Sequence, residues 1–155
     1  MYNLLILHNI RSVLNVGAIF RTADAIGINK IYLTGYTPTP YDRFGRINYA
    51  FKKASVGAYE FVKWEQIRDV STLINKLKKE HFKIFAIEQN EKSIDYKKVK
   101  LGDKNVFIFG NEIRGVSKQI LNKVDKILEI PMRGKKESLN VSTSVGIVLF
   151  KILDK

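Results

Sequence analysis

The sequence predicts an α/β protein with a parallel sheet, because buried strands alternate with helices along its 155 residues. The unbroken apolar runs at residues 4–7 and 106–109 have the length and composition of strands buried on both faces. Between such runs, as in residues 16–26, apolar side chains return at helical spacing. We expect residues 1–155 to form a single domain that buries a substantial core.

The other elements are predicted from the same patterns. Strands are expected at residues 30–33, near 60–64, at 83–87 and near 127–130, and helices near 47–55, at 66–80, near 118–122 and from about 139 to the end. Residues 34–48 contain two glycines and two prolines and are expected to form a long loop. A loop of that length inside a compact domain usually serves a function or moves.

Composition excludes several classes of protein. The chain has no cysteine, so it has no disulfide framework, no thiolate zinc site and no cysteine nucleophile, which fits the reducing cytoplasm. No apolar stretch approaches the ~20 residues of a membrane helix, so we expect no membrane segment. The first residues lack the charged start and cleavage site of a signal peptide. His8 and His81 form no metal-ligand pattern, and we expect no metal.

The formal net charge of +12 is typical of a nucleic-acid-binding protein. The alternative is a lysine-rich proteome that solvates its surfaces with lysine. The arginines favour nucleic acid, because the guanidinium fork suits phosphate and six of them lie in or beside segments that contain glycine or asparagine. These predicted RNA- or nucleotide-facing residues are Arg11, Arg21, Arg43, Arg46, Arg114 and Arg133.

Polar segments follow four of the predicted strands, where a parallel sheet binds its ligands. They are HNIRSVLNVG from His8, EQNEKS after Ile87, GNEIRG after Phe109 and PMRGKKESLN after Ile130. Glycine lets a backbone approach a ligand closely, and free N–H groups ahead of a helix suit phosphates or bases. Neither GxxxxGK[ST] nor GxGxxG after a strand occurs, which argues against a phosphate-loop ATPase and a standard dinucleotide fold.

Three motifs in order carry a family resemblance: NVGAIFRTA at residues 15–23, FGNEIRGVS at 109–117 and IPMRGKKESLNVS at 130–142. Together they resemble the SpoU/TrmH-type branch of the SPOUT RNA methyltransferases, in a minimal single-domain form. The resemblance implies a Rossmann-like α/β fold with a deep C-terminal trefoil knot, and a homodimer. It also implies ribose 2′-O-methylation of tRNA or rRNA with S-adenosylmethionine as cofactor.

The resemblance further implies which residues hold the cofactor. Backbone groups at Ile87, Gly110 and Ile130, together with Ser138 and Leu139, would bind its adenosine and methionine parts. For Ile130 and Leu139, ordinary core packing is an equally good account. Gly110 has the stronger functional case, because glycine is favoured where a backbone meets a ligand.

The catalytic set that the resemblance implies is Arg21, Asn15, Glu112, Ser138 and Asn140. Asn15, Ser138 and Asn140 precede predicted helices, so helix capping is their alternative role. Arg21 matches the family's catalytic arginine. Because arginine does not deprotonate in proteins, clamping a phosphate and polarising the 2′-hydroxyl is favoured over a role as base, which is left open. Glu112 could pair with an arginine, hold the loop or face solvent.

The last predicted helix is apolar all round, which indicates burial on more than one side. Ser142 and Gly146 would let another backbone approach closely, and in the family this helix joins the dimer interface. Core packing in a monomer is the competing account. Two alternatives to the proposed enzyme are a catalytically silent RNA-binding protein on the same scaffold and an RNA base N-methyltransferase.

Overall fold

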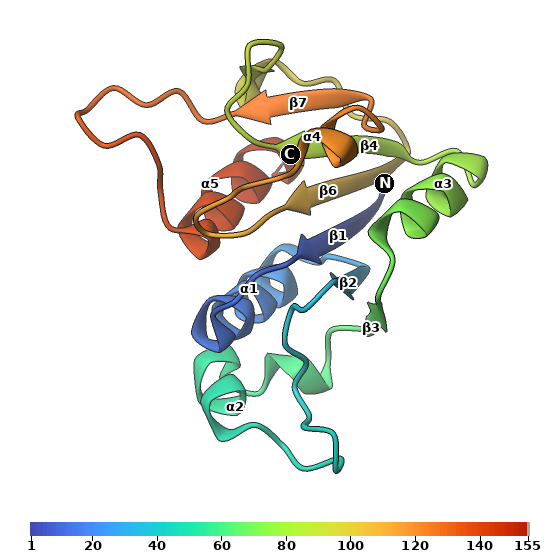
Figure 1. The fold of residues 1–155 in the computed structure, drawn as a ribbon, viewed down its shortest axis with the longest axis vertical. Helices are drawn as coiled ribbons and strands as arrows, with labels where there is room; N and C mark the ends of the chain where they lie inside the picture. Colours follow the sequence, from blue (N-terminus) through green and yellow to red (C-terminus); the bar gives the residue numbers. More distant parts are fainter. Residues whose placement is uncertain (155) are drawn as a thin grey trace.

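A computed structural model describes residues 1–154 and contains one seven-stranded sheet in which all paired strands are parallel (Figure 1). The strand order is β3-β2-β1-β6-β4-β7-β5. The strands are β1 (Tyr2–His8), β2 (Lys30–Thr34), β3 (Trp64–Ile67), β4 (Lys83–Ile87), β5 (Ile94–Asp95), β6 (Lys104–Phe109) and β7 (Lys126–Glu129). The predicted parallel α/β fold is confirmed.

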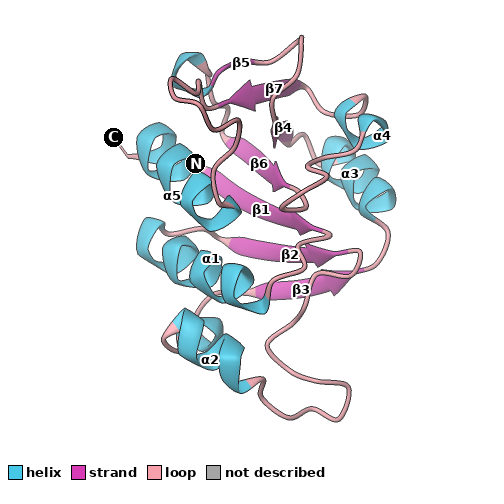
Figure 2. Cartoon of the chain, turned by 60° about the vertical axis from the view of Figure 1, so that its left-hand side comes forward, coloured by secondary structure: helices cyan, strands magenta, loops and turns pink. Residues whose placement is uncertain are grey.

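Helices cover both faces of the sheet (Figure 2). One face carries α1 (Val13–Ile26), α2 (Tyr49–Ser55) and α5 (Val141–Leu153), and the other carries α3 (Val70–Lys79) and α4 (Lys118–Leu121). Two short 3-10 helices, η1 (Ala58–Glu60) and η2 (Tyr96–Lys98), complete the elements. The chain therefore forms three layers, with the sheet in the middle.

The central strands alternate between two cores. In β1, Leu5 and Leu7 join the cluster beneath α1 and α5, whereas Leu4 and Ile6 join the cluster beneath α3. This alternation follows from the two-residue repeat of a strand, and it explains why β1 is apolar along most of its length. Burial on both faces fixes the sheet and thereby the edge where its strands end.

The first helix begins three residues earlier than predicted. Ser12 is its N-cap, because the Ser12 side chain accepts a hydrogen bond from the backbone N–H of Asn15 over 3.2 Å. The prediction that Asn15 could cap this helix is therefore wrong. Asn15 lies inside the first turn, and its side chain is free to bond elsewhere.

The segment from residue 58 to 80 also differs from the prediction. Residues 58–60 form η1, and the strand comes later, at β3, because Gly57 turns the backbone with φ +80° and η1 follows it. Asp69 then caps α3 by accepting from the N–H of Ser71 over 3.0 Å, so the helix begins at Val70 rather than at residue 66. The two-residue strand β5 and η2 were not predicted.

The last predicted helix begins at Val141, with Asn140 as its N-cap. Its burial is one-sided within the chain: Val145, Val148 and Leu149 are buried, whereas Ile147 and Phe150 are exposed. The predicted burial on more than one side is therefore not met by a single copy of the chain. Within residues 1–154, no helix is both long enough and apolar enough to cross a membrane.

Candidate active site

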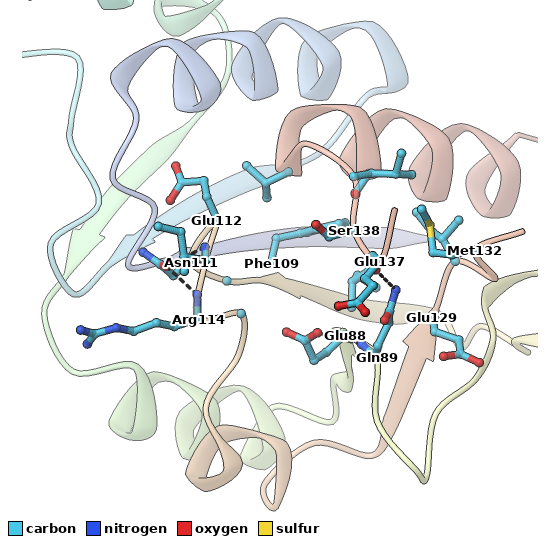
Figure 3. A pocket seen from close by; sticks show the side chains of 18 residues that line it. Glu88, Gln89, Phe109, Asn111, Glu112, Arg114, Glu129, Met132, Glu137 and Ser138 are labelled. Atoms are coloured by element: carbon cyan, nitrogen blue, oxygen red, sulfur yellow. Dashed lines mark hydrogen bonds between the residues drawn. The ribbon is translucent and has the colours of Figure 1, made fainter. Parts of the chain in front are cut away.

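A cavity of about 210 Å³ lies at the carboxyl edge of the sheet (Figure 3). Its walls come from the ends of β4, β6 and β7, the loops that follow them and the first turn of α5. The structure brings all five residues predicted to hold the cofactor to this one cavity; they are Ile87, Gly110, Ile130, Ser138 and Leu139. Of these, Gly110 is buried, the two isoleucines are half-buried, and Ser138 and Leu139 are exposed.

The turn after β6 explains why residue 110 is glycine. A Cβ on Gly110 would lie 2.5 Å from the carbonyl oxygen of Gly115, which is closer than side chains approach a backbone. The turn is fixed by the side-chain oxygen of Asn111, which accepts from the N–H groups of Ile113 and Arg114, both over 2.9 Å. The fold of the turn therefore requires glycine at position 110, whether or not a ligand binds. The sequence analysis attributed this glycine only to the close approach of a ligand.

The loop after β4 supports this turn from the other side. One carboxylate oxygen of Glu88 accepts from the N–H of Val116 over 2.9 Å. The neighbouring Gln89 donates its side-chain N–H to the carbonyl of Glu137 over 2.6 Å, which ties the segment before α5 to β4 (Figure 3). Both residues lie in the segment EQNEKS, which was predicted to bind a ligand because it follows a strand, but neither was selected as a site residue.

The carboxylate of Glu112 holds the start of α1. It accepts from the backbone N–H groups of Arg11 (3.1 Å) and Ser12 (2.9 Å) and from the side chain of Asn15 (3.3 Å). Partial burial acts to raise the pKa of Glu112, but these donors outweigh it and the pKa is lowered. Glu112 is therefore a charged group that bonds the turn after β6 to the loop after β1.

Asn15 extends this connection to α5. Its side-chain oxygen accepts from the Asn140 amide over 3.1 Å. The Asn140 side-chain oxygen caps α5 by accepting from the N–H groups of Ser142 (2.9 Å) and Thr143 (3.3 Å). Asn140 is therefore a helix cap that also joins the network of Asn15 and Glu112.

A second, open cavity of about 750 Å³ adjoins the first, since residues 111–114 line both. Arg11, Tyr36 and Arg114 border it, so the structure brings two of the predicted RNA-facing arginines together here. Asn111 donates to the hydroxyl of Tyr36 over 3.0 Å and to the carbonyl of Asn9 over 2.9 Å. Asn111 and Tyr36 were not among the predicted site residues.

The remaining predicted arginines lie elsewhere. Arg43 and Arg46 lie in the loop between β2 and α2, and Arg133 is exposed in the segment between β7 and α5. Arg21 is exposed on α1 and lines neither cavity. Its own chain therefore does not bring Arg21 to the residues predicted to act with it.

The first cavity differs in charge from the chain as a whole. Its lining includes four glutamates and one arginine; these are Glu88, Glu112, Glu129, Glu137 and Arg114. Arg114 and Met132 lie toward opposite ends of the cavity (Figure 3). Among residues 1–154 there is no group of three or more histidine, cysteine, aspartate or glutamate side chains placed to hold a metal ion. The excess of glutamates over arginine in the lining favours a ligand that carries positive charge over an anionic one.

Fold and cavity define an α/β protein whose ligand site is built from loops at the carboxyl edge of a parallel sheet. The chain belongs to the SpoU rRNA Methylase family, whose model matches residues 2–150. The resemblance inferred from the three motifs is confirmed.

Relatives and solved structures agree with this membership. A protein of Borreliella burgdorferi named as an uncharacterized tRNA/rRNA methyltransferase is 36% identical over 150 residues, which are 96% of this chain and 62% of that protein. The tRNA (guanosine(18)-2′-O)-methyltransferase of Aquifex aeolicus is 30% identical over 143 residues, 92% of this chain and 64% of that protein. This chain thus spans about three fifths of the length of these curated relatives.

Two crystal structures share the fold over 97% of this chain. One is the A. aeolicus TrmH/SpoU tRNA modifying enzyme, with a TM-score of 0.85, 28% identity and 73% of that chain covered. The other is the AdoMet-bound rRNA methyltransferase from Sinorhizobium meliloti, with a TM-score of 0.87, 25% identity and 55% of that chain covered.

Proposed function

We propose that the chain is an RNA ribose 2′-O-methyltransferase that uses S-adenosylmethionine and acts on tRNA or rRNA. The observation that carries this proposal is the gathering of Ile87, Gly110, Ile130, Ser138 and Leu139 around one cavity. Family membership and the names of the relatives support it, since one relative is named as a tRNA 2′-O-methyltransferase and one structural neighbour as AdoMet-bound.

The chemistry of the cavity fits this cofactor. S-adenosylmethionine carries a cationic sulfonium and a cationic ammonium, and glutamates outnumber arginine in the cavity wall. Apolar side chains of Phe109, Met132 and Val141 offer a surface for the adenine ring. Bound there, S-adenosylmethionine would supply an electrophilic methyl group. Backbone groups at Gly110 and Leu139 would orient it.

Asn15, Glu112 and Asn140 act as positioning residues in this proposal. The carboxylate of Glu112 accepts three hydrogen bonds, so it is committed to holding the α1 start rather than to accepting a substrate proton. The hydrogen bonds of Asn15 and Asn140 hold the first and third motifs in a fixed position relative to the second. Such fixed geometry matters because methyl transfer depends on alignment of the attacking hydroxyl with the methyl group.

We propose a homodimer built on the outer faces of α1 and α5. These helices pack side by side on one face of the sheet (Figures 1 and 2). Leu14 on α1 is 61% exposed, and Ile147 and Phe150 on α5 are also exposed, so both helices present apolar side chains at the surface. A Cβ on Gly146 would meet nothing within 4 Å inside the chain, which leaves room for a second backbone.

Arg21 lies on the same outer side of α1, seven residues after Leu14 and therefore on nearly the same face. Because it lines neither cavity of its own chain, we propose that Arg21 acts in the cavity of the partner copy. There it would clamp a phosphate and polarise the ribose hydroxyl, with Arg11 and Arg114 holding the neighbouring RNA backbone.

The test is transfer of a labelled methyl group from S-adenosylmethionine to bulk tRNA and rRNA, followed by nucleoside mass spectrometry. The expected product is a 2′-O-methylated nucleoside. A methyl group on a base would instead favour the N-methyltransferase reading. Absence of both transfer and calorimetric cofactor binding would favour a silent RNA-binding protein.

The single-domain organisation of residues 1–155, the trefoil knot and the cytoplasmic location stay predictions. The knot is implied by family membership, and the cytoplasmic location is favoured by the absence of cysteine.

A further inference from the structure

The loop between β2 and α2 carries an exposed aromatic ring flanked by two arginines. Phe44 is 66% exposed, and the guanidinium carbons of Arg43 and Arg46 lie 4.8 Å and 5.0 Å from its ring centroid. A single exposed apolar side chain is ordinary on a protein surface. A ring stacked with two guanidinium groups at the tip of a loop is more specific, because it combines a π surface with positive charge.

This loop tip has a defined structure. The carboxylate of Asp42 accepts from the backbone N–H groups of Phe44 (2.8 Å) and Arg46 (2.9 Å) and from the Arg46 side chain (2.9 Å). Tyr41 and Ile47 pair as an antiparallel bridge at the base of the tip. Gly45 supplies the left-handed backbone that the turn needs, with φ +76°. The tip therefore presents Phe44 from a hairpin rather than from a free loop.

The other end of the loop is anchored beside the candidate active site. Thr37 is buried, and its hydroxyl donates to the carbonyl of Leu7 over 2.8 Å and accepts from the N–H of Ile10 over 3.1 Å. Tyr36 lines the second cavity. The loop leaves the carboxyl edge of the sheet and extends away from it before returning to α2 (Figure 2).

The position of Phe44 limits what it could contact. Phe44 lies eight positions after Tyr36 in the chain, a span of at most roughly 26–29 Å. Phe44 lies in neither cavity, so it is not placed to touch the reacting ribose. Any RNA that Phe44 contacts must therefore extend beyond the segment held at the cavities.

We propose that Phe44, together with Arg43 and Arg46, stacks on an unpaired base of the substrate RNA next to the segment held in the active site. This inference rests on the proposed function, whose substrate class it narrows to RNA with an unstacked base at that distance. Single-stranded bases stack on aromatic rings and on guanidinium planes, whereas the faces of duplex bases are covered by their neighbours. The net charge of +12 supplies the general attraction to phosphate.

The test is the affinity for a fluorescein-labelled RNA strand of about 20 mixed nucleotides, with a blunt duplex of equal length as comparison. Phe44→Ala should weaken single-strand binding by about 5- to 140-fold, the range that loss of one base stack implies. Duplex binding should change about twofold or less. Phe44→Trp should keep the affinity, and Phe44→Leu should lose as much as Phe44→Ala, because leucine is apolar but has no π face.

Phe61→Ala is the matched control. Phe61 is 76% exposed and precedes β3, at the opposite edge of the sheet from the cavities, so its loss should leave RNA affinity unchanged. The inference is overturned if Phe44→Ala behaves like Phe61→Ala, or if duplex and single strand lose affinity equally. It is also overturned if Phe44→Leu keeps full affinity, which would mean that Phe44 contributes apolar surface to RNA binding without stacking on a base.

Methyl transfer separates this inference from the proposed function. In steady-state assays with bulk tRNA, Phe44→Ala should raise KM and change kcat about twofold or less, with unchanged S-adenosylmethionine affinity. If methyl transfer occurs and its KM is the same in the wild type and in Phe44→Ala, the inference is overturned but the proposed function stands. If single-strand affinity depends on Phe44 but the protein binds no S-adenosylmethionine, the inference is supported and the proposed methyltransferase function is contradicted.

Discussion

The side-chain amide of Asn140 donates to the side-chain oxygen of Asn15 over 3.1 Å, across 125 positions of the chain. Asn15 in turn donates to Glu112 over 3.3 Å. One carboxamide therefore connects the start of α1, the turn after β6 and the cap of α5. These are the three motif segments, and the last two border the first cavity.

We expect Asn15→Asp to be more destabilising than Asn15→Ala. Alanine removes two partly exposed hydrogen bonds, and at ~0.5–1.5 kcal/mol each the melting temperature should fall by roughly 2–12 °C. Aspartate keeps an acceptor for Asn140, but it places a second carboxylate beside Glu112 and adds repulsion. Thermal unfolding followed by circular dichroism measures both, with Asn75→Asp on the exposed side of α3 as control. Equal melting temperatures for the two Asn15 variants would argue against the network.

Glu112 should make stability depend on pH. Its folded-state pKa is lowered from the ordinary 4.5, so the carboxylate stabilises the fold above 4.5, and this contribution is lost as pH falls through the lowered value. Glu112→Gln cannot carry this charge. In urea unfolding, the variant should be less stable than the wild type at neutral pH, and the gap should narrow below pH 4.5. A stability difference between the two proteins that does not change with pH would mean that the charge of Glu112 contributes nothing to the fold.

Most of the fold was predictable because burial on both faces leaves a clear sequence signal. The apolar run before Gly110 became β6, and the spacing from Val16 onward became most of α1. Element starts were less predictable, since they depend on caps. Ser12 and Asp69 set the starts of α1 and α3, because each side chain accepts a hydrogen bond from a backbone N–H in the first turn of its helix.

The location of the site could be predicted from the sequence, whereas its hydrogen bonds could not. Polar segments after strands correctly located the cavity, because parallel strands bring their ends to one edge. The individual roles of Glu88, Asn111 and Tyr36 were not predicted, since they depend on partners 28 to 102 positions away. Such pairings follow from strand order, which short-range patterns do not contain.

Gly110→Ala should damage the turn itself. The added Cβ would lie 2.5 Å from the Gly115 carbonyl oxygen, so the turn after β6 must shift and both the melting temperature and the cofactor affinity should fall. Gly134→Ala, in the loop after β7, is the control, because a Cβ there would meet nothing within 4 Å. Calorimetry with S-adenosylmethionine and thermal unfolding measure the two effects. Normal cofactor affinity in Gly110→Ala would mean that the turn can relax without reshaping the cavity.

Gly146→Leu should weaken the proposed dimer. Inside one chain the new side chain meets open space, so the fold should persist and gain up to ~1 kcal/mol from helix propensity. In the dimer the same side chain would separate the two α5 helices. Sedimentation at micromolar concentration should show a wild-type dimer, a variant shifted toward monomer, and an unchanged Lys76→Leu control on α3. A monomeric wild type would contradict the homodimer.

Arg21→Ala should leave cofactor affinity nearly intact and lower the methylation rate by at least ~10²-fold, the usual scale for loss of a positioned catalytic group. Arg21→Lys keeps the charge and loses the planar fork, so it should recover little. Asp24→Ala, also exposed on α1, is the control and should keep full activity. These rates are measured on a confirmed RNA substrate.

Variants of Arg21 also test whether residues from two chains form one active site. Ser144→Phe fills the first cavity from α5 and should abolish cofactor binding while leaving Arg21 in place. If Arg21 acts in the partner's cavity, an equimolar mixture of Arg21→Ala and Ser144→Phe restores about a quarter of wild-type activity, because half of the dimers then hold one complete site. If Arg21 acts within its own chain, the mixture stays inactive. Near-normal turnover by Arg21→Ala alone would reduce Arg21 to a surface residue of α1, even with the cofactor assignment intact.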